Sequence, residues 1–343
     1  MNQPRKPHLR RPPLCAALLF LCALAAHADA IQIQHPDPCA VTHPMNDAWF
    51  TGPMLANTAA TAPRGHALIE PYLYDVTAQG AFQPGGSRQP VPHQNSYGSL
   101  TYVIYALTDT TGIGLIPTAG YTTATGVPSS AGPDAGDFTF QLQHRVAQFV
   151  PCHRVPTISL AVQQALPTGR YDNLGTRPTN AFGAGAWTTT PELLTMMYFW
   201  LPNHRIVRMR LNFADSFSSA VPISGASVYG TAAGFRGAAH PASSLSIDNS
   251  WEYSLNRRLV LASDIVFHNT GSTRVAGSYA ATSTQPASTI AFNSGWSNNW
   301  YLAPAIEYSW KPTIGVLLGL RITPAGRNTS DTLTPAIAIN IIR

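Results

Sequence analysis

Apolar and polar residues alternate along most of the chain. In one segment Phe138, Phe140 and Leu142 alternate with Thr139 and Gln141. A period of two predicts a β-strand with one apolar face and one polar face. The same pattern recurs in segments that each have at least the roughly 9–11 residues a tilted strand needs to cross a bilayer. These segments are 65–76, 99–107, 111–123, 137–149, 156–166, 183–200, 205–213, 243–254, 259–268, 299–310, 313–323 and 332–342.

The connections between these segments alternate between short and long. The short ones are 108–110, 150–155, 201–204, 255–258 and 311–312. The long ones are 77–98, 124–136, 167–182, 214–242, 269–298 and 324–331. Short turns at one end and long loops at the other are typical of transmembrane β-barrels, whose short turns are periplasmic. We therefore predict an all-β, up-and-down antiparallel barrel of the Gram-negative outer-membrane type with about 12 strands. A further hairpin inside 214–242 would make 14, and the alternative class is an exported soluble β-sandwich.

The first 28 residues have the features of a secretory signal peptide. Arg5, Lys6, Arg10 and Arg11 precede an apolar run over 14–26, and small residues follow at spacings that suit cleavage after Ala28 or after Ala30. The run is too short to span a membrane as a helix. The predicted organisation is a leader at 1–28, an irregular periplasmic or plug segment at 29–64, and a barrel at 65–343.

Charge is scarce and nearly balanced. The chain has 21 Lys and Arg, four of them in the leader, against 16 Asp and Glu, and charged residues make up 11% of it. A soluble domain typically has about 25%. This composition fits a barrel with a lipid-facing surface, and the basic excess of the leader gives no argument for a nucleic-acid partner.

Two features depart from an ideal barrel. Proline removes a hydrogen bond from a strand ladder, and five prolines fall inside predicted strands: Pro71, Pro117, Pro191, Pro304 and Pro335. Pro71 and Pro335 lie on the first and last strands, so we expect an irregular closing seam. Pro191 suggests a later start for its long strand. The chain ends in Arg343, whereas many outer-membrane barrels end in an aromatic residue.

Three stretches carry a family resemblance. They are AWFTGPMLANTAATAPRGHALIEPYLYD (48–75), ALPTGRYDNLG (165–175) and WEYSLNRRLVLASDIVFH (251–268). With them the chain resembles the outer-membrane β-barrel transporter family labelled for the MetA pathway of phenol degradation, from about Trp49 to the C-terminus. The resemblance implies a channel or facilitated transporter for small solutes, aromatic or hydrophobic ones included. It implies no catalytic residue and no enzyme activity.

Polar residues on the inward phase of the strands are the candidates for a lumen lining or constriction. They are Gln141, Gln143, Arg145, Arg208, Arg210, Asn212, Asp248, Glu252, Asp264, His268, Glu307 and Arg321. Charged rings of this kind select solutes in channels. The alternative interpretation is that they pair across a narrow lumen and fill it, Arg208 and Arg210 with Glu252 and Asp248. The two interpretations are compatible.

Cys39 and Cys152 are the cysteines that remain after cleavage. Both are predicted to lie in the oxidising periplasm. A disulfide between them would tether the N-terminal segment to the barrel mouth, and the sequence leaves the two thiols bonded or free.

Other functions have weaker support. His144 and Ser159 lie on adjacent predicted strands, which allows a barrel-borne lipid hydrolase, and the long loops allow a structural or adhesive barrel. No HxxxH or CxxC spacing indicates a metal, and no glycine-rich loop indicates a nucleotide. The expected partners are membrane lipid, lipopolysaccharide, the barrel assembly machinery and a small solute, with no cofactor.

Overall fold

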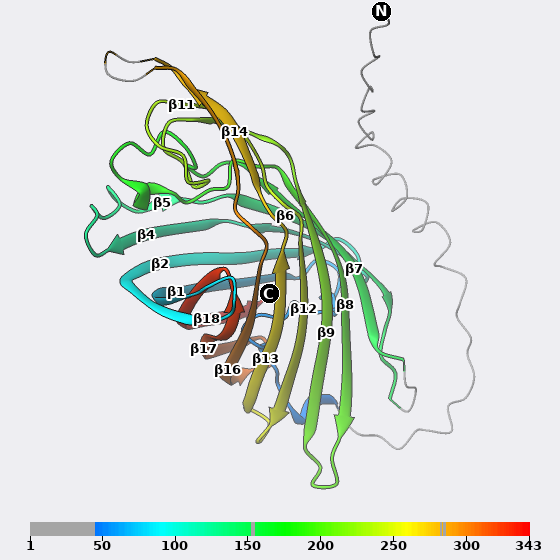
Figure 1. Cartoon of the computed structure of the whole chain (residues 1–343). Helices are drawn as coiled ribbons and strands as arrows, with labels where there is room; N and C mark the ends of the chain where they lie inside the picture. Colours follow the sequence, from blue (N-terminus) through cyan, green and yellow to red (C-terminus); the bar gives the residue numbers. More distant parts are fainter. Residues whose placement is uncertain (1–44, 152–154, 282, 284–285) are drawn as a thin grey trace, which may run out of the picture. The chain divides into compact units, whose positions relative to one another are not determined.

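The structure is a computed structural model that describes residues 45–151, 155–281, 283 and 286–343. The predicted leader, Cys39 and Cys152 lie outside the described residues. Within them, helical turns are limited to η2 (Met45–Asp47) and η3 (Pro178–Asn180). No described helix is long or apolar enough to span a membrane. The strands that build the large sheet in Figure 1 are β1 (Ala67–Phe82), β2 (Arg88–Ala106), β3 (Thr111–Ile116), β4 (Thr118–Ala124), β5 (Asp134–Ala135), β6 (Phe138–Ala147), β7 (Thr157–Leu166), β8 (Thr188–Trp200), β9 (Ile206–Ser218), β12 (Ser244–Ser254), β13 (Leu259–Thr270), β16 (Ser297–Lys311), β17 (Ile314–Arg327) and β18 (Thr329–Ile342).

The sheet closes into an antiparallel barrel. Neighbouring strands pair in sequence order, and β1 pairs with both β2 and β18, for example through Tyr72 and Ala338. β3 and β4 form one continuous transmembrane strand along β2, and β5 and β6 form the next one. The barrel therefore has 12 strands, as the alternation predicts.

The prolines are accommodated because each lacks a ladder partner on one side. Pro117 separates β3 from β4, and its carbonyl still accepts a hydrogen bond from the Thr101 N–H at 3.1 Å. Pro71 and Pro335 both fall in gaps of the ladder between β1 and β18, so the closing seam is irregular. Pro304 pairs with Ser263 on β13 but has no partner on β17, and Pro191 pairs with Val162 on β7 but has none on β9.

The apolar phase of the strands faces outward. Trp300 and Trp310 are 45% and 50% exposed on one face of β16, and Leu318 on β17 is 56% exposed. Leu317, one residue earlier, is buried inside the barrel. These exposed side chains match an apolar band with aromatic residues near both edges, as lipid requires.

Four further strands correct the predicted loops. β10 (Val221–Ser224) and β11 (Phe235–His240) lie within 214–242, and β14 (Arg274–Tyr279) and β15 (Ser288–Asn293) lie within 269–298. They form a separate sheet in the order β10-β11-β14-β15, so they add nothing to the barrel wall and the alternative of 14 strands is wrong. Phe235, Ile223, Ala239 and Val275 make a small core for this sheet. In Figure 1, β11 and β14 lie beyond the ends of β12 and β13.

Several predicted boundaries are also wrong. The connection 77–98 is mostly strand, because β1 and β2 continue as a hairpin to the turn at 83–87. The connection 324–331 reduces to Asn328, which adopts a positive φ of 52° between β17 and β18. The strand predicted at 183–200 begins at Thr188, before Pro191. The polar residues in these regions continue the ladders because backbone pairing does not require apolar side chains.

Among the outer loops, Tyr229 gives a pH-dependent prediction. Its hydroxyl donates a hydrogen bond to the Ala184 carbonyl at 2.5 Å. Burial, then the nearby Asp137 and Tyr171, raises its pKa from 10.0 to about 12. Because the folded pKa is the higher one, this loop contact is fully stabilising below about pH 10 and is lost as the pH rises through about 12. Absorbance titration should show one tyrosinate step near pH 12 that Tyr229→Phe removes. A lost step near pH 10 instead would contradict this assignment.

Candidate functional site

The inner wall of the barrel holds the backbone of residues 48–62, which we call the lumen segment. On β16, the Glu307 carboxylate accepts hydrogen bonds from the N–H groups of Thr51 at 2.7 Å and Gly52 at 3.1 Å. On β13, the Asp264 carboxylate accepts from the N–H groups of Leu55 and Ala56, both at 3.2 Å. Carboxylates on one side of the lumen thus satisfy backbone donors of the segment.

Donors on other strands bind the carbonyl groups of the lumen segment. Arg210 Nη1 donates to the Ala56 carbonyl at 2.6 Å, and Asn212 Nδ2 to the Asn57 carbonyl at 2.8 Å. Gln143 Nε2 donates to the Thr58 carbonyl at 3.0 Å. Ser159 Oγ donates to the Ala59 carbonyl at 2.6 Å. Because these contacts use the backbone, they hold the path of the segment and do not depend on its side chains.

Small residues make room for the segment. A Cβ added at Gly315 on β17 would lie 2.1 Å from Thr51 Cγ2, and one at Gly319 would lie 2.9 Å from Met54 Sδ. Gly52 adopts a φ of 124°, which a side chain would strain. Ala59 is fully buried against Ala161, Leu194 and Met196. The wall and the segment are therefore complementary in shape as well as in hydrogen bonding.

Two arginines of the candidate set share one carboxylate. Arg208 binds Glu252 through two hydrogen bonds, one of them from Nε at 2.5 Å. Arg210 Nε lies 3.5 Å from the same carboxylate. The register places Arg208 directly opposite Glu252, as the pairing interpretation predicts, but Arg210 lies beside Glu252 and not Asp248. Arg208 also lies 4.3 Å from the centre of the Phe50 ring.

The other candidates are dispersed over the inner surface. Gln141 Nε2 donates to Gln143 Oε1 at 3.3 Å. Arg145 donates to the Asp109 carbonyl at 3.0 Å, at the end with short turns. His268 contacts Thr270 at 3.1 Å. Arg321 lies 4.8 Å from the Tyr301 ring centre. The candidates therefore lie at several heights along the strands and do not gather in one ring.

The hydrolase alternative is not supported by the placement of its two residues. Arg145 is in register with Ser159, whereas His144 is in register with Leu160. His144 and Ser159 therefore face opposite sides of the wall. His144 lies 2.9 Å from Thr111 Oγ1, and the Ser159 hydroxyl binds the lumen segment. The described residues also contain no cluster of three or more His, Cys, Asp or Glu that could hold a metal ion.

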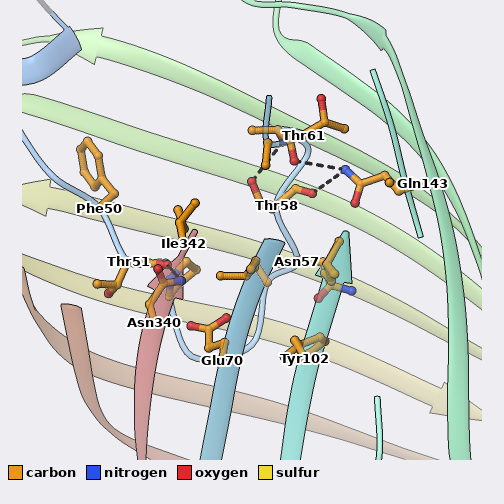
Figure 2. A pocket seen from close by; sticks show the side chains of 18 of the residues that line it. Phe50, Thr51, Asn57, Thr58, Thr61, Glu70, Tyr102, Gln143, Asn340 and Ile342 are labelled. Atoms are coloured by element: carbon orange, nitrogen blue, oxygen red, sulfur yellow. Dashed lines mark hydrogen bonds between the residues drawn. The ribbon is translucent and has the colours of Figure 1, made fainter. Parts of the chain in front are cut away.

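A cavity of about 350 Å³ lies between the lumen segment and wall residues from β1, β2, β3, β6, β9 and β18. Figure 2 shows Phe50, Thr51 and Asn57 of the segment on this cavity, with Glu70, Tyr102 and Asn340 from the wall. Tyr72 packs edge-on against Tyr102, with ring centres 6.1 Å apart. The lining is therefore part aromatic and aliphatic, and part polar.

A second cavity of about 100 Å³ lies between Leu55 and Asn57 of the segment and the wall. Its wall includes Glu192 on β8 and Asp248 on β12.

The sequence analysis did not identify four cavity residues: Glu70, Tyr72, Tyr102 and Glu192. Glu70 alternates in phase with Leu68 and Tyr72, so its inward position could be predicted from the sequence. The cavity beside Glu70 depends on the lumen segment. The position of that segment could not be predicted, because its sequence has no regular alternation.

Comparison with known structures identifies the fold class of the chain. No family model and no curated relative matches the sequence. The crystal structure of an outer membrane channel from Pseudomonas putida F1 superposes with a TM-score of 0.62 at 13% identity, covering 84% of this chain and 100% of that one. The translocator domain of the autotransporter NalP from Neisseria meningitidis gives 0.38 at 10% identity, covering 82% and 89%. The toluene transporter TbuX from Ralstonia pickettii gives 0.37 at 9%, covering 82% and 90%. The chain has the fold of an outer-membrane β-barrel, so the predicted fold class is confirmed.

Proposed function

We propose that the protein is a channel or facilitated transporter for small solutes, aromatic or hydrophobic ones included, in the outer membrane of a Gram-negative bacterium. The observation that carries this proposal is the cavity inside a closed barrel, lined by Tyr72, Tyr102, Leu68 and Ile104 on the wall and by the lumen segment opposite. Such a mixed lining suits a small solute with an apolar body. The similar fold of the Pseudomonas putida outer membrane channel supports this proposal. The proposal includes no enzyme activity.

Within this proposal the lumen segment is a plug. Its backbone is bound by Glu307 and Asp264 on one side and by Arg210 and Gln143 on another. A barrel filled in this way resists free diffusion of large polar solutes. Solutes would pass beside the segment through the cavity, or when the segment shifts. Export through residues 1–28, insertion by the barrel assembly machinery, and contact with lipopolysaccharide belong to the same proposal.

Filling the cavity should abolish transport. Gly112 lines the cavity, and a Cβ there would lie 3.5 Å from Ile104 Cγ2, an ordinary contact. Gly112→Phe should therefore reduce uptake of radiolabelled toluene, benzyl alcohol and benzylamine to the level of cells without the protein. Uptake is measured in a Gram-negative host with an intact lipopolysaccharide layer, which slows passive entry of apolar compounds.

The matched control is Gly85→Phe, because a Cβ at Gly85 meets nothing within 4 Å. This variant should transport like the wild type. Wild-type cells that take up none of toluene, benzyl alcohol and benzylamine faster than cells lacking the protein would defeat the transport proposal. That result would favour the alternative function, an adhesive barrel that binds through the β10-β11-β14-β15 sheet.

A further inference from the structure

We propose that the solutes this barrel selects carry a protonated amine on a small apolar or aromatic body. This inference rests on the proposed function and names its substrate class. It follows from the carboxyl groups in the walls of the two cavities: Glu70, Glu192 and Asp248 line these cavities and form no salt bridge with the described residues.

The larger cavity has one acidic residue in its lining, Glu70, and two arginines, Arg208 and Arg210. Both arginines are already engaged, because each lies against Glu252 and Arg210 also donates to the Ala56 carbonyl. Glu70 forms no salt bridge with any of the described residues. Glu70 is therefore the acidic side chain of this lining that has no ion pair among the described residues.

The smaller cavity repeats this charge on the other side of the lumen segment. It is lined by Glu192 and Asp248 and by no Lys, Arg or His. Asp248 is 8% exposed, and its Oδ1 is buried without a hydrogen-bond partner among the described residues. Among the described residues, Glu192 accepts one hydrogen bond, which comes from Asn57 Nδ2 and is long at 3.3 Å. A cationic solute thus finds acceptors on both sides of Leu55 and Asn57.

The surroundings of Glu70 suit an organic cation better than a metal ion. Tyr72 and Tyr102 lie on the same cavity and present ring faces and edges. Aromatic faces attract ammonium groups, and the attraction grows where water is excluded. Leu68, Ile104 and Ile342 add aliphatic surface for the body of the solute. The volume of about 350 Å³ accommodates a single ring with a short side chain.

Neutral and anionic solutes fit this charge less well. A hydrocarbon would bury Glu70 further and would offer the carboxyl group no cationic partner, which is costly in an apolar setting. A carboxylate solute would have to compete with Glu252 for Arg208, which binds it through two hydrogen bonds, and with the Ala56 carbonyl for Arg210. An ammonium group supplies the missing partner and gives the cavity a charge-assisted hydrogen bond.

The test compares ligands of one shape and different charge. Benzylamine, benzyl alcohol and benzoate are bound to the full-length exported protein in detergent, and affinities are measured by calorimetry at fixed salt. We expect benzylamine to bind most tightly. Glu70→Gln should weaken benzylamine by roughly tenfold or more, the size expected when a buried charge loses its partner, and should leave benzyl alcohol unchanged. The control Asp47→Asn removes an equal charge from an exposed residue outside both cavities and should change neither affinity.

The ligand series on the wild type keeps the inference falsifiable even if Glu70→Gln fails to fold. Equal binding of benzylamine and benzyl alcohol, or tightest binding of benzoate, would overturn it. So would a folded Glu70→Gln protein with wild-type affinity for benzylamine. Benzylamine binding without uptake into cells would defeat the transport proposal while supporting the cation preference, and uptake of all three ligands without preference would defeat only the preference.

Discussion

Replacing Glu252 by alanine should destabilise the barrel by about 3–5 kcal/mol, the usual cost of leaving buried charges without their partner. Glu252 is fully buried, and the side chains of Arg208 and Arg210 are 9% and 5% exposed. Its loss leaves two adjacent guanidinium groups that repel each other inside a lumen with little water. The measurement is urea unfolding in lipid vesicles, followed by tryptophan fluorescence and by the gel mobility of unheated samples.

The control for this variant is Arg170→Ala. Arg170 lies 3.8 Å from Asp134, with the two side chains 54% and 42% exposed. Exposed ion pairs contribute about 0–1 kcal/mol, so this variant should unfold close to the wild type. If Glu252→Ala unfolds at the same urea concentration as Arg170→Ala, water reaches the two arginines and the pair is not a structural element of the lumen.

Releasing the lumen segment should open the barrel. The double variant Asp264→Ala with Glu307→Ala removes the acceptors of the Thr51, Gly52, Leu55 and Ala56 N–H groups. Each hydrogen bond to a charged group contributes about 1.5–3 kcal/mol, so the segment should lose most of its attachment to β13 and β16. Single-channel recordings in planar bilayers should show larger and longer openings than the wild type.

Asp248→Ala is the matched control for this double variant. It removes a carboxylate from the same lumen, but Asp248 makes none of the backbone contacts described for the segment. Its openings should stay at the wild-type level, with a change in ion selectivity alone. If the double variant conducts no more than Asp248→Ala, the segment is not a plug, and the cavity beside it is the whole path.

Much of the barrel could be predicted from local pattern. The alternation placed Gln141, Gln143, Arg208, Arg210 and Glu252 on the inner phase, where they are buried. It did so because successive side chains of any strand point to opposite faces, whatever the strand pairs with. The pairing of Arg208 with Glu252 could also be predicted, since β9 and β12 are neighbours in the barrel wall and each residue lies a few positions from a short turn, at 201–205 and 255–258.

The outer sheet could not be predicted in this way. β11 and β14 contain small residues and no clean alternation, as in the sequences FRGAAH and RVAGSY. β11 pairs with β14 across two strands of the barrel wall, β12 and β13. Pairing between strands so far apart depends on where the barrel brings the two loops, and that information lies in no single segment.

The alternation alone decides that this chain has a barrel wall with an apolar outside and a polar inside. The reason is that the face on which each side chain lies is set within its own strand and does not depend on the strand's neighbours. What fills the inside was decided by contacts between residues more than 200 positions apart, such as Thr51 with Glu307 and Leu55 with Asp264. The lumen segment has no period, and apart from Pro53 each of its residues offers the same backbone N–H and C=O groups. Only the closed barrel, by bringing carboxylates, amides and arginines around one narrow space, selects the path that satisfies them.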